Sequence, residues 1–127
     1  MSRQAIYLVE DNQDNSDLFC VFLADRFSVR CFRTGLELLD HLGAGVEELP
    51  DLFVLDISLP GIDGVSLMKR IRADYLYKDI PVLALTGPCH GRRRRLIQAG
   101  FDWYLSKPIL EEELFHVIEG LMTKSLI

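Results

Sequence analysis

Five short apolar runs recur along the chain, and a pattern of helical spacing follows each of them. Residues 52–55 form the clearest run, an apolar stretch between turn residues that is typical of a strand buried on both faces. The other runs are residues 5–9, 28–32, 80–85 and 103–105. Strands that alternate with helices predict a parallel sheet with right-handed crossovers. We therefore expect a doubly wound α/β fold, (βα)5, with helices on both faces of a five-stranded sheet.

Apolar residues at helical spacing predict which side of each helix faces the sheet. Residues 12–16 and Thr34 can cap the first two helices, and Gly43 and Gly100 can end the second and the fourth. The expected inward positions are Leu18, Val21 and Phe22; Leu36, Leu39 and Leu42; Leu67, Met68 and Ile71; Leu96 and Ile97; and Leu114, Val117, Ile118 and Leu121. No repeat or linker interrupts the pattern, so we expect residues 1–127 to form one domain.

Length and charge exclude several classes of protein. A chain of 127 residues can bury roughly two thirds of its unfolded surface. The net charge of -5 argues against direct nucleic-acid binding. No apolar run approaches the roughly 18 residues of a membrane span, and no signal peptide is present, so we expect a cytoplasmic protein without membrane insertion. Cys20, Cys31 and Cys89 lack metal-ligand spacing and are expected to be free thiols.

Four of the predicted strands end in polar residues that a buried strand otherwise lacks. These residues are Glu10 and Asp11, Asp56, Thr86, and Lys107. Asp56 by itself would fit a turn cap equally well. In a parallel sheet, however, all five residues gather at the carboxyl edge, where ligands bind. Two carboxylates 4 Å apart repel by roughly 4 kcal/mol at an effective dielectric of about 20, so the acids need a cation, and oxygen ligands suit Mg²⁺ or Mn²⁺.

This set of residues predicts phosphoryl chemistry at Asp56. The carboxylate could attack a phosphoryl group and form an acyl phosphate, while the metal and Lys107 neutralise the phosphoryl oxygens. The Thr86 hydroxyl could hydrogen-bond one of these oxygens. Gly87 carries no side chain, so the phosphoryl group could approach the backbone there.

The same residues, in this order, resemble the receiver domain of two-component response regulators over essentially the whole chain. The resemblance rests on Val9-Glu10-Asp11-Asn12, Leu55-Asp56, Leu59-Pro60-Gly61, Asp63-Gly64, Ala84-Leu85-Thr86 and Tyr104-Leu105-Ser106-Lys107-Pro108. It implies the flavodoxin-like version of the fold expected above. It also implies that Asp56 accepts a phosphoryl group from a histidine kinase or a histidine phosphotransfer protein. Such a protein catalyses only its own phosphorylation and dephosphorylation.

The resemblance further implies a role for each of the other site residues. Asp11 and Asp56 would bind Mg²⁺ directly, Glu10 would act through water, and the Ser58 backbone carbonyl would be a third protein ligand. Thr86 and Tyr104 would form the switch pair, in which the hydroxyl moves toward the phosphate and the ring turns inward. Gly87 and Lys107 would contact the phosphate, and a cis peptide bond before Pro108 would aim the lysine.

The sequence departs from the family pattern between Thr86 and Phe101. Residues 87–91 form a loop about one residue shorter than is usual for the family. Pro88 fixes its own φ angle and has no N–H, so it stiffens a segment that usually moves on activation. Because Pro88 offers no group that could orient a water molecule, we expect slow self-dephosphorylation. His90 and Cys89 have no neighbouring partner in the sequence and indicate no site.

A basic run in the fourth predicted helix suggests a second functional surface. A charge run of this kind is usually only a solvated helix face. The alternative is a partner-binding face made by the fourth helix, the last strand and the last helix, because interfaces favour Trp and Arg. That face would include Arg92, Arg93, Arg94, Arg95, Trp103 and Tyr104.

Two other functions remain open. The chain could be a pseudo-receiver that binds a partner without phosphate, although the intact acids, Thr86 and Lys107 argue against this. It could also resemble the metal-dependent phosphatases with an aspartyl nucleophile. Those enzymes place a second Asp where this chain has Ser58, and they carry a cap domain for which this chain is too short.

Overall fold

The computed structural model describes residues 3–87 and 93–123 and contains one parallel sheet with the strand order β2-β1-β3-β4-β5. Strands and helices alternate along these residues, as the sequence predicts. The elements are β1 (Ala5–Val9), α1 (Gln13–Leu23), β2 (Ser28–Phe32), α2 (Gly35–Gly43), β3 (Leu52–Asp56), α3 (Gly64–Ala73), β4 (Val82–Thr86), α4 (Arg93–Ala99), β5 (Trp103–Ser106) and α5 (Glu111–Thr123). The doubly wound topology places β1 and β3 at the centre of the sheet, next to each other.

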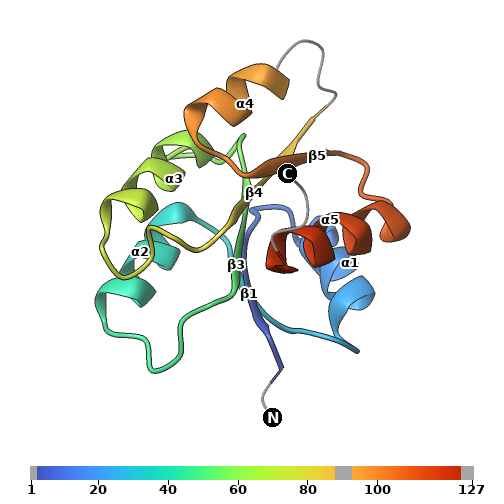
Figure 1. Cartoon of the computed structure of the whole chain (residues 1–127), viewed down its shortest axis with the longest axis horizontal. Coiled ribbons are helices and arrows are strands. Elements are labelled where there is room, and N and C mark those ends of the chain that lie inside the picture. Colours follow the sequence, from blue (N-terminus) through green and yellow to red (C-terminus); the bar gives the residue numbers. More distant parts are fainter. Residues whose placement is uncertain (1–2, 88–92, 124–127) are drawn as a thin grey trace.

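Helices cover both faces of the sheet, with α2, α3 and α4 on one side and α1 and α5 on the other (Figure 1). Alternate strand residues supply the two apolar layers. Tyr7, Phe53 and Leu55 pack in the layer under α2, α3 and α4. Leu8 and Val54 pack in the layer under α1 and α5. The central strands are therefore buried on both sides, which explains their uninterrupted apolar sequences.

Side chains just outside the helices satisfy the free N–H groups of the first turns. Asn12 caps α1 by accepting from the Asn15 N–H, and Thr34 caps α2 by accepting from the Glu37 N–H. Asp63 caps α3 in the same way. The capping predictions for the first two helices are therefore confirmed. The predicted inward faces of α3 and α5 are also confirmed, since all seven of those residues are buried.

Three predictions of an inward helix face were wrong in part. In α1, Leu18 and Val21 are 42% and 74% exposed, and Phe19 and Leu23 are buried instead. In α2 the outward residue is Leu36, and Leu38 takes its place in the core. In α4 Leu96 is buried, but Ile97 is 40% exposed. Each of these helices has apolar residues on more than one side, so spacing alone did not identify the side that contacts the sheet.

The first two strands have the predicted bounds, and the bounds of the other three differ from the prediction by one or two residues. The fourth strand begins at Val82 rather than at residue 80, because Pro81 has no N–H for the ladder. It extends through Thr86, and β3 extends through Asp56, so both polar residues end a strand. None of the helices in the described part of the chain has the length and apolar character that a membrane span requires.

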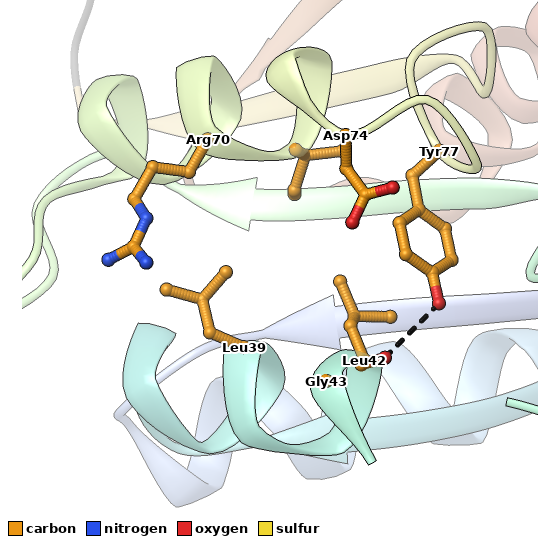
Figure 2. Close-up of a pocket in the computed structure, with 7 residues that line it drawn as sticks. Leu39, Leu42, Gly43, Arg70, Asp74 and Tyr77 are labelled. Atoms are coloured by element: carbon orange, nitrogen blue, oxygen red, sulfur yellow. Dashed lines mark hydrogen bonds between the residues drawn. The ribbon is translucent and has the colours of Figure 1, made fainter. Parts of the chain in front are cut away.

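A cavity of about 190 Å³ lies between the ends of α2 and α3 (Figure 2). Its lining residues are Leu39, Leu42, Gly43, Arg70, Ile71, Asp74 and Tyr77. Helices in a parallel sheet run opposite to the strands, so helix C-terminal ends lie at the amino edge of the sheet. This cavity is therefore at the other edge from Asp56.

Candidate acidic site at the carboxyl edge of the sheet

The strand register brings the predicted carboxylates together. In the pairing of β1 with β3, Val9 lies opposite Leu55, so Glu10 and Asp56 follow at the same level. One carboxylate oxygen from each of Glu10, Asp11 and Asp56 lies within 4.8 Å of the others. Glu10 and Asp56 are buried, whereas Asp11 is exposed. The structure thus assembles an acidic cluster that is closed on the protein side and open through Asp11.

Lys107 supplies the positive charge of this cluster. Its Nζ lies 2.6 Å from Asp56 Oδ2 and 3.0 Å from Glu10 Oε1. The backbone that carries it is held by a hydrogen bond of 2.7 Å from the Lys107 N–H to the Thr86 carbonyl oxygen. The peptide bond between Lys107 and Pro108 is cis, as the family resemblance implies. The residue after β1, the last residue of β3 and the residue after β5 therefore meet at one point.

The charges of the cluster shift one another's pKa values. Burial raises the pKa of Glu10 to about 7, and the neighbouring Asp56 carboxyl adds to this effect against the opposing Lys107 ammonium. Burial alone would raise the pKa of Asp56, but hydrogen bonds with Lys107, Glu10 and the Ser58 N–H hold it below its ordinary value. Burial would likewise lower the pKa of Lys107, yet the two carboxylates raise it. Asp56 and Lys107 therefore both stay charged, in an ion pair whose carboxylate is buried and whose ammonium is half-buried.

The loop after β3 packs closely against the Asp56 carboxylate. The Ser58 N–H donates to Asp56 Oδ1 at 2.8 Å, and the Ser58 side chain is exposed. Gly64, the first residue of α3, lies so near that a Cβ there would be 2.5 Å from the Asp56 carbonyl oxygen and 2.6 Å from Ile57 Cα. In the sequence, Gly64 stands out only as part of the Asp63-Gly64 motif that resembles the receiver family. Its need for close backbone contact came to light only in the structure.

Thr86 and Gly87 lie at the same edge as the acidic cluster. Asp56 is paired with Leu85, so Thr86 is the next residue beyond that pair. Thr86 is fully buried, and its Oγ1 has no hydrogen-bond partner within residues 3–87 and 93–123. A Cβ built on Gly87 would meet no described atom within 4 Å. Among the described residues, the Thr86 hydroxyl is therefore unpaired, and no atom crowds the Cβ position of Gly87.

The described residues of the predicted arginine and aromatic face lie on α4 and β5. Trp103 and Tyr104 are half-buried, with ring centroids 5.7 Å apart. Arg93 Cζ lies 5.5 Å from the Tyr104 ring centroid, and Arg94 and Arg95 are exposed. Tyr104 packs against the layer under α2, α3 and α4. Five residues that the sequence singled out in this region, Pro88, Cys89, His90, Gly91 and Arg92, lie outside the described residues.

The donor set of the acidic cluster fits a divalent cation. Three carboxylates offer oxygen atoms, which are the ligands that Mg²⁺ and Mn²⁺ prefer. Lys107 contributes a single positive charge to these acids, so it does not neutralise them all. The exposed side of the cluster at Asp11 would leave room for the water molecules that Mg²⁺ keeps. Glu10, Asp11 and Asp56 are therefore candidate ligands.

Known proteins are similar to this chain in sequence. A family model of the response regulator receiver domain matches residues 6–119. The polar-differentiation response regulator DivK of Brucella abortus (strain 2308) is 33% identical over 121 residues, which are 94% of this chain and 96% of DivK. The transcriptional regulatory protein CreB of Escherichia coli (strain K12) is 32% identical over 98% of this chain and 53% of CreB.

A solved structure extends the likeness to the fold. The receiver domain of the sensor histidine kinase PA1611 from Pseudomonas aeruginosa PAO1 was solved with a magnesium ion coordinated in its active site cleft. It matches with a TM-score of 0.84 and 29% identity, over 96% of this chain and 99% of that chain. The chain therefore belongs to the response regulator receiver domain family and has the flavodoxin-like fold of that family.

Proposed function

We propose that this protein receives a phosphoryl group on Asp56 from the phosphohistidine of a histidine kinase or a histidine phosphotransfer protein, in a reaction that requires Mg²⁺. The proposal rests on one observation above the others. A buried carboxylate lies within 4.8 Å of two further carboxylates and 2.6 Å from a lysine ammonium. Membership of the receiver family supports the same role.

The transfer makes one bond and breaks one. An Asp56 carboxylate oxygen bonds to phosphorus, the bond from phosphorus to the donor imidazole breaks, and the imidazole leaves and takes up a proton. A Mg²⁺ ion held by Glu10, Asp11 and Asp56 would neutralise negative charge on the phosphoryl oxygens. Lys107, now paired with Asp56 Oδ2, would move its ammonium onto a phosphoryl oxygen. The Asp56 oxygen is available for attack in its ionised form, because hydrogen bonds hold the pKa of this carboxyl below its ordinary value.

The Thr86 hydroxyl is the group that would sense the acyl phosphate. It is buried and has no hydrogen-bond partner among the described residues, which is costly unless a partner arrives. A phosphoryl oxygen on Asp56 would be that partner. Tyr104 would then turn inward and change the face that it forms with Arg93 and Trp103. We expect no other substrate, so the protein would act only on itself, in the cytoplasm.

Phosphorylation with a small donor tests the proposal directly. The parent, Asp56→Asn and the matched variant Asp79→Asn, which changes an exposed acid, are incubated with acetyl phosphate and Mg²⁺. Intact-mass measurement should show one added phosphoryl group on the parent and on Asp79→Asn, and none on Asp56→Asn or after addition of EDTA. Equal labelling of Asp56→Asn would contradict the proposal. A parent that takes up no phosphoryl group would indicate a pseudo-receiver instead.

Thr86→Val separates switching from folding. Valine has nearly the same shape, and the hydroxyl it replaces is unpaired among the described residues, so stability should stay the same or rise. Labelling of Asp56 should continue, while the change in Tyr104 fluorescence or chemical shift on phosphorylation should be lost. A variant that switches like the parent would remove Thr86 from the mechanism.

A further inference from the structure

Two cysteines from different elements lie in contact on the side of the sheet covered by α1. Cys20 is in α1 and Cys31 is in β2, and their Sγ atoms are 3.3 Å apart. Both are free thiols in this structure. A disulfide bond is about 2.05 Å long, so the sulfur atoms would need to approach by only about 1.3 Å to form one.

The fold brings these thiols together in a defined way. Cys31 points to the same side of β2 as Val29, which packs against the layer that contains Phe19 and Leu23 of α1. Cys20 follows Phe19 directly and is half-buried beside that layer. Cys31 is exposed, because β2 is an edge strand. An oxidant in solution can therefore reach the Cys31 sulfur, and the Cys20 sulfur lies in contact with it.

We propose that Cys20 and Cys31 form a reversible dithiol–disulfide site whose oxidant is a small soluble disulfide such as oxidised glutathione. The inference depends on the packing of α1 against β2 and not on the function proposed for Asp56. The proposed modification is a covalent bond at the edge of the sheet, and the soluble disulfide is the only other reactant that it requires.

The reaction is two successive thiol–disulfide exchanges. The Cys31 sulfur attacks one sulfur of the oxidant, the oxidant's S–S bond breaks, and one glutathione thiol leaves. The Cys20 sulfur then attacks the Cys31 sulfur of the mixed disulfide and releases the second glutathione. The two protons of Cys20 and Cys31 end on the two released thiols, so two protein thiols are oxidised and one soluble disulfide is reduced.

The order of attack follows from the surroundings of the two thiols. Burial and the neighbouring Cys31 raise the pKa of the Cys20 thiol to about 12, so Cys20 is a poor first nucleophile at neutral pH. Cys31 is the exposed member and meets the oxidant first. Once Cys31 is in the mixed disulfide, its thiol no longer raises the pKa of Cys20, and Cys20 lies in contact with the sulfur that it attacks to complete the bond.

The disulfide would tie the second half of α1 to the edge strand. Cys20 lies eight residues beyond the α1 cap at Asn12, about 12 Å along the helix axis. The bond is therefore distant from Asp11, and phosphorylation of Asp56 should proceed at the same extent in the oxidised protein. The disulfide between Cys20 and Cys31 and the phosphorylation of Asp56 can therefore be tested separately, and failure of one does not imply failure of the other.

Peptide mapping under a glutathione redox buffer tests the site. The Cys89→Ser variant has Cys20 and Cys31 as its only cysteines. It is equilibrated with an excess of oxidised over reduced glutathione and is then quenched with acid. Trypsin cleaves after Arg26 and Arg30, so Cys20 and Cys31 leave on separate peptides. We expect a linked peptide pair, a monomer mass lower by two hydrogen atoms, and loss of both alkylatable thiols. Excess reduced glutathione should restore them.

Single-cysteine variants give the matched control. In a protein with both Cys31→Ser and Cys89→Ser, we expect Cys20 to remain largely a free thiol. With both Cys20→Ser and Cys89→Ser, Cys31 should accumulate as the glutathione adduct, because no second sulfur can resolve it. A Cys89→Ser protein that also stops at the glutathione adduct, or that forms the bond only between two chains, would overturn the proposal.

Discussion

Arg72 Nη2 lies 2.6 Å from Asp102 Oδ2, and this pair joins the last turn of α3 to the residue before β5. The Asp102 carboxylate also accepts the Val82 N–H at 2.7 Å, at the start of β4. The remaining acceptors of the guanidinium are the carbonyl oxygens of Lys78 at 3.0 Å, Ile80 at 2.7 Å and Gly100 at 3.0 Å. One planar side chain therefore holds the segments that enter β4 and β5, the strands that deliver Thr86 and Lys107.

Arg72→Lys should destabilise the fold although it keeps the charge. An ammonium cannot reach four acceptors with the flat fork that a guanidinium offers, so carbonyl groups lose their partners. We expect a loss of about 1–3 kcal/mol in the free energy of unfolding, measured by urea denaturation. Arg70→Lys changes an exposed arginine of the same helix and should stay within about 0.5 kcal/mol. Equal urea midpoints for the two variants would show that the network contributes nothing.

Lys107→Met should leave the acidic cluster without its own positive charge. The side chains of Glu10 and Asp56 are only 1% and 4% exposed, so their repulsion is poorly screened. Without Mg²⁺ we expect a loss of about 1–3 kcal/mol in stability. Added Mg²⁺ should raise the melting temperature of the variant more than that of the parent, because only the cation then compensates the acids.

The control for this variant is Lys69→Met, which removes an exposed lysine of α3. Its stability and its response to Mg²⁺ should match those of the parent. If Mg²⁺ stabilised Lys107→Met less than the parent, the lysine would have to act with the cation rather than in place of it.

Gly64→Ala should lower the free energy of unfolding, for a steric reason that helix propensity does not include. Alanine is the better helix former by about 1 kcal/mol, but its Cβ would lie 2.5 Å from a backbone oxygen of Asp56. Backbone atoms cannot rotate away as a side chain can, so α3 must shift. We expect a net loss of about 1–3 kcal/mol and weaker labelling of Asp56. Gly43→Ala, where a Cβ meets nothing within 4 Å, should be neutral or stabilising.

Tyr77→Phe should change stability in a pH-dependent way. The Tyr77 side chain is 1% exposed, and its hydroxyl makes a 3.4 Å hydrogen bond to the Leu42 carbonyl oxygen (Figure 2). At about pH 7 this long bond should be worth less than about 1 kcal/mol. Burial, with Asp74 and Tyr7, raises the pKa of the folded phenol above its ordinary value of 10.0.

The sign of this pH effect follows from linkage. Above about pH 10 the unfolded parent loses the phenol proton and the folded parent keeps it, so parent stability falls as the pH rises. Phenylalanine has no such proton. The amount by which Tyr77→Phe is less stable than the parent should therefore shrink or change sign between about pH 7 and about pH 11. Chemical denaturation of the parent and of Tyr77→Phe at both pH values measures this difference in the free energy of unfolding. An offset between Tyr77→Phe and the parent that is the same at both pH values would contradict this prediction.

Much of this protein could be predicted from local sequence, because each feature depends on a short stretch of chain. Apolar runs bounded by turn residues predicted the five strands, and the alternation with helices predicted a parallel sheet. A parallel sheet brings all strand C-terminal ends to one edge, so Glu10, Asp56 and Lys107 could be placed together without coordinates. Thr34 was recognised as a helix cap from the residues next to it.

Tertiary packing alone decided the rest. In α1, either Leu18 and Val21 or Phe19 and Leu23 could have faced the sheet, and the way in which α1 packs against the strands buries the second pair. The contact of Cys20 with Cys31 and the approach of Gly64 to Asp56 depend on how a helix lies against a strand. In each case the loops between the two elements and the packing of the helix set the distance between the two residues. A periodic pattern of apolar residues contains no information about such distances.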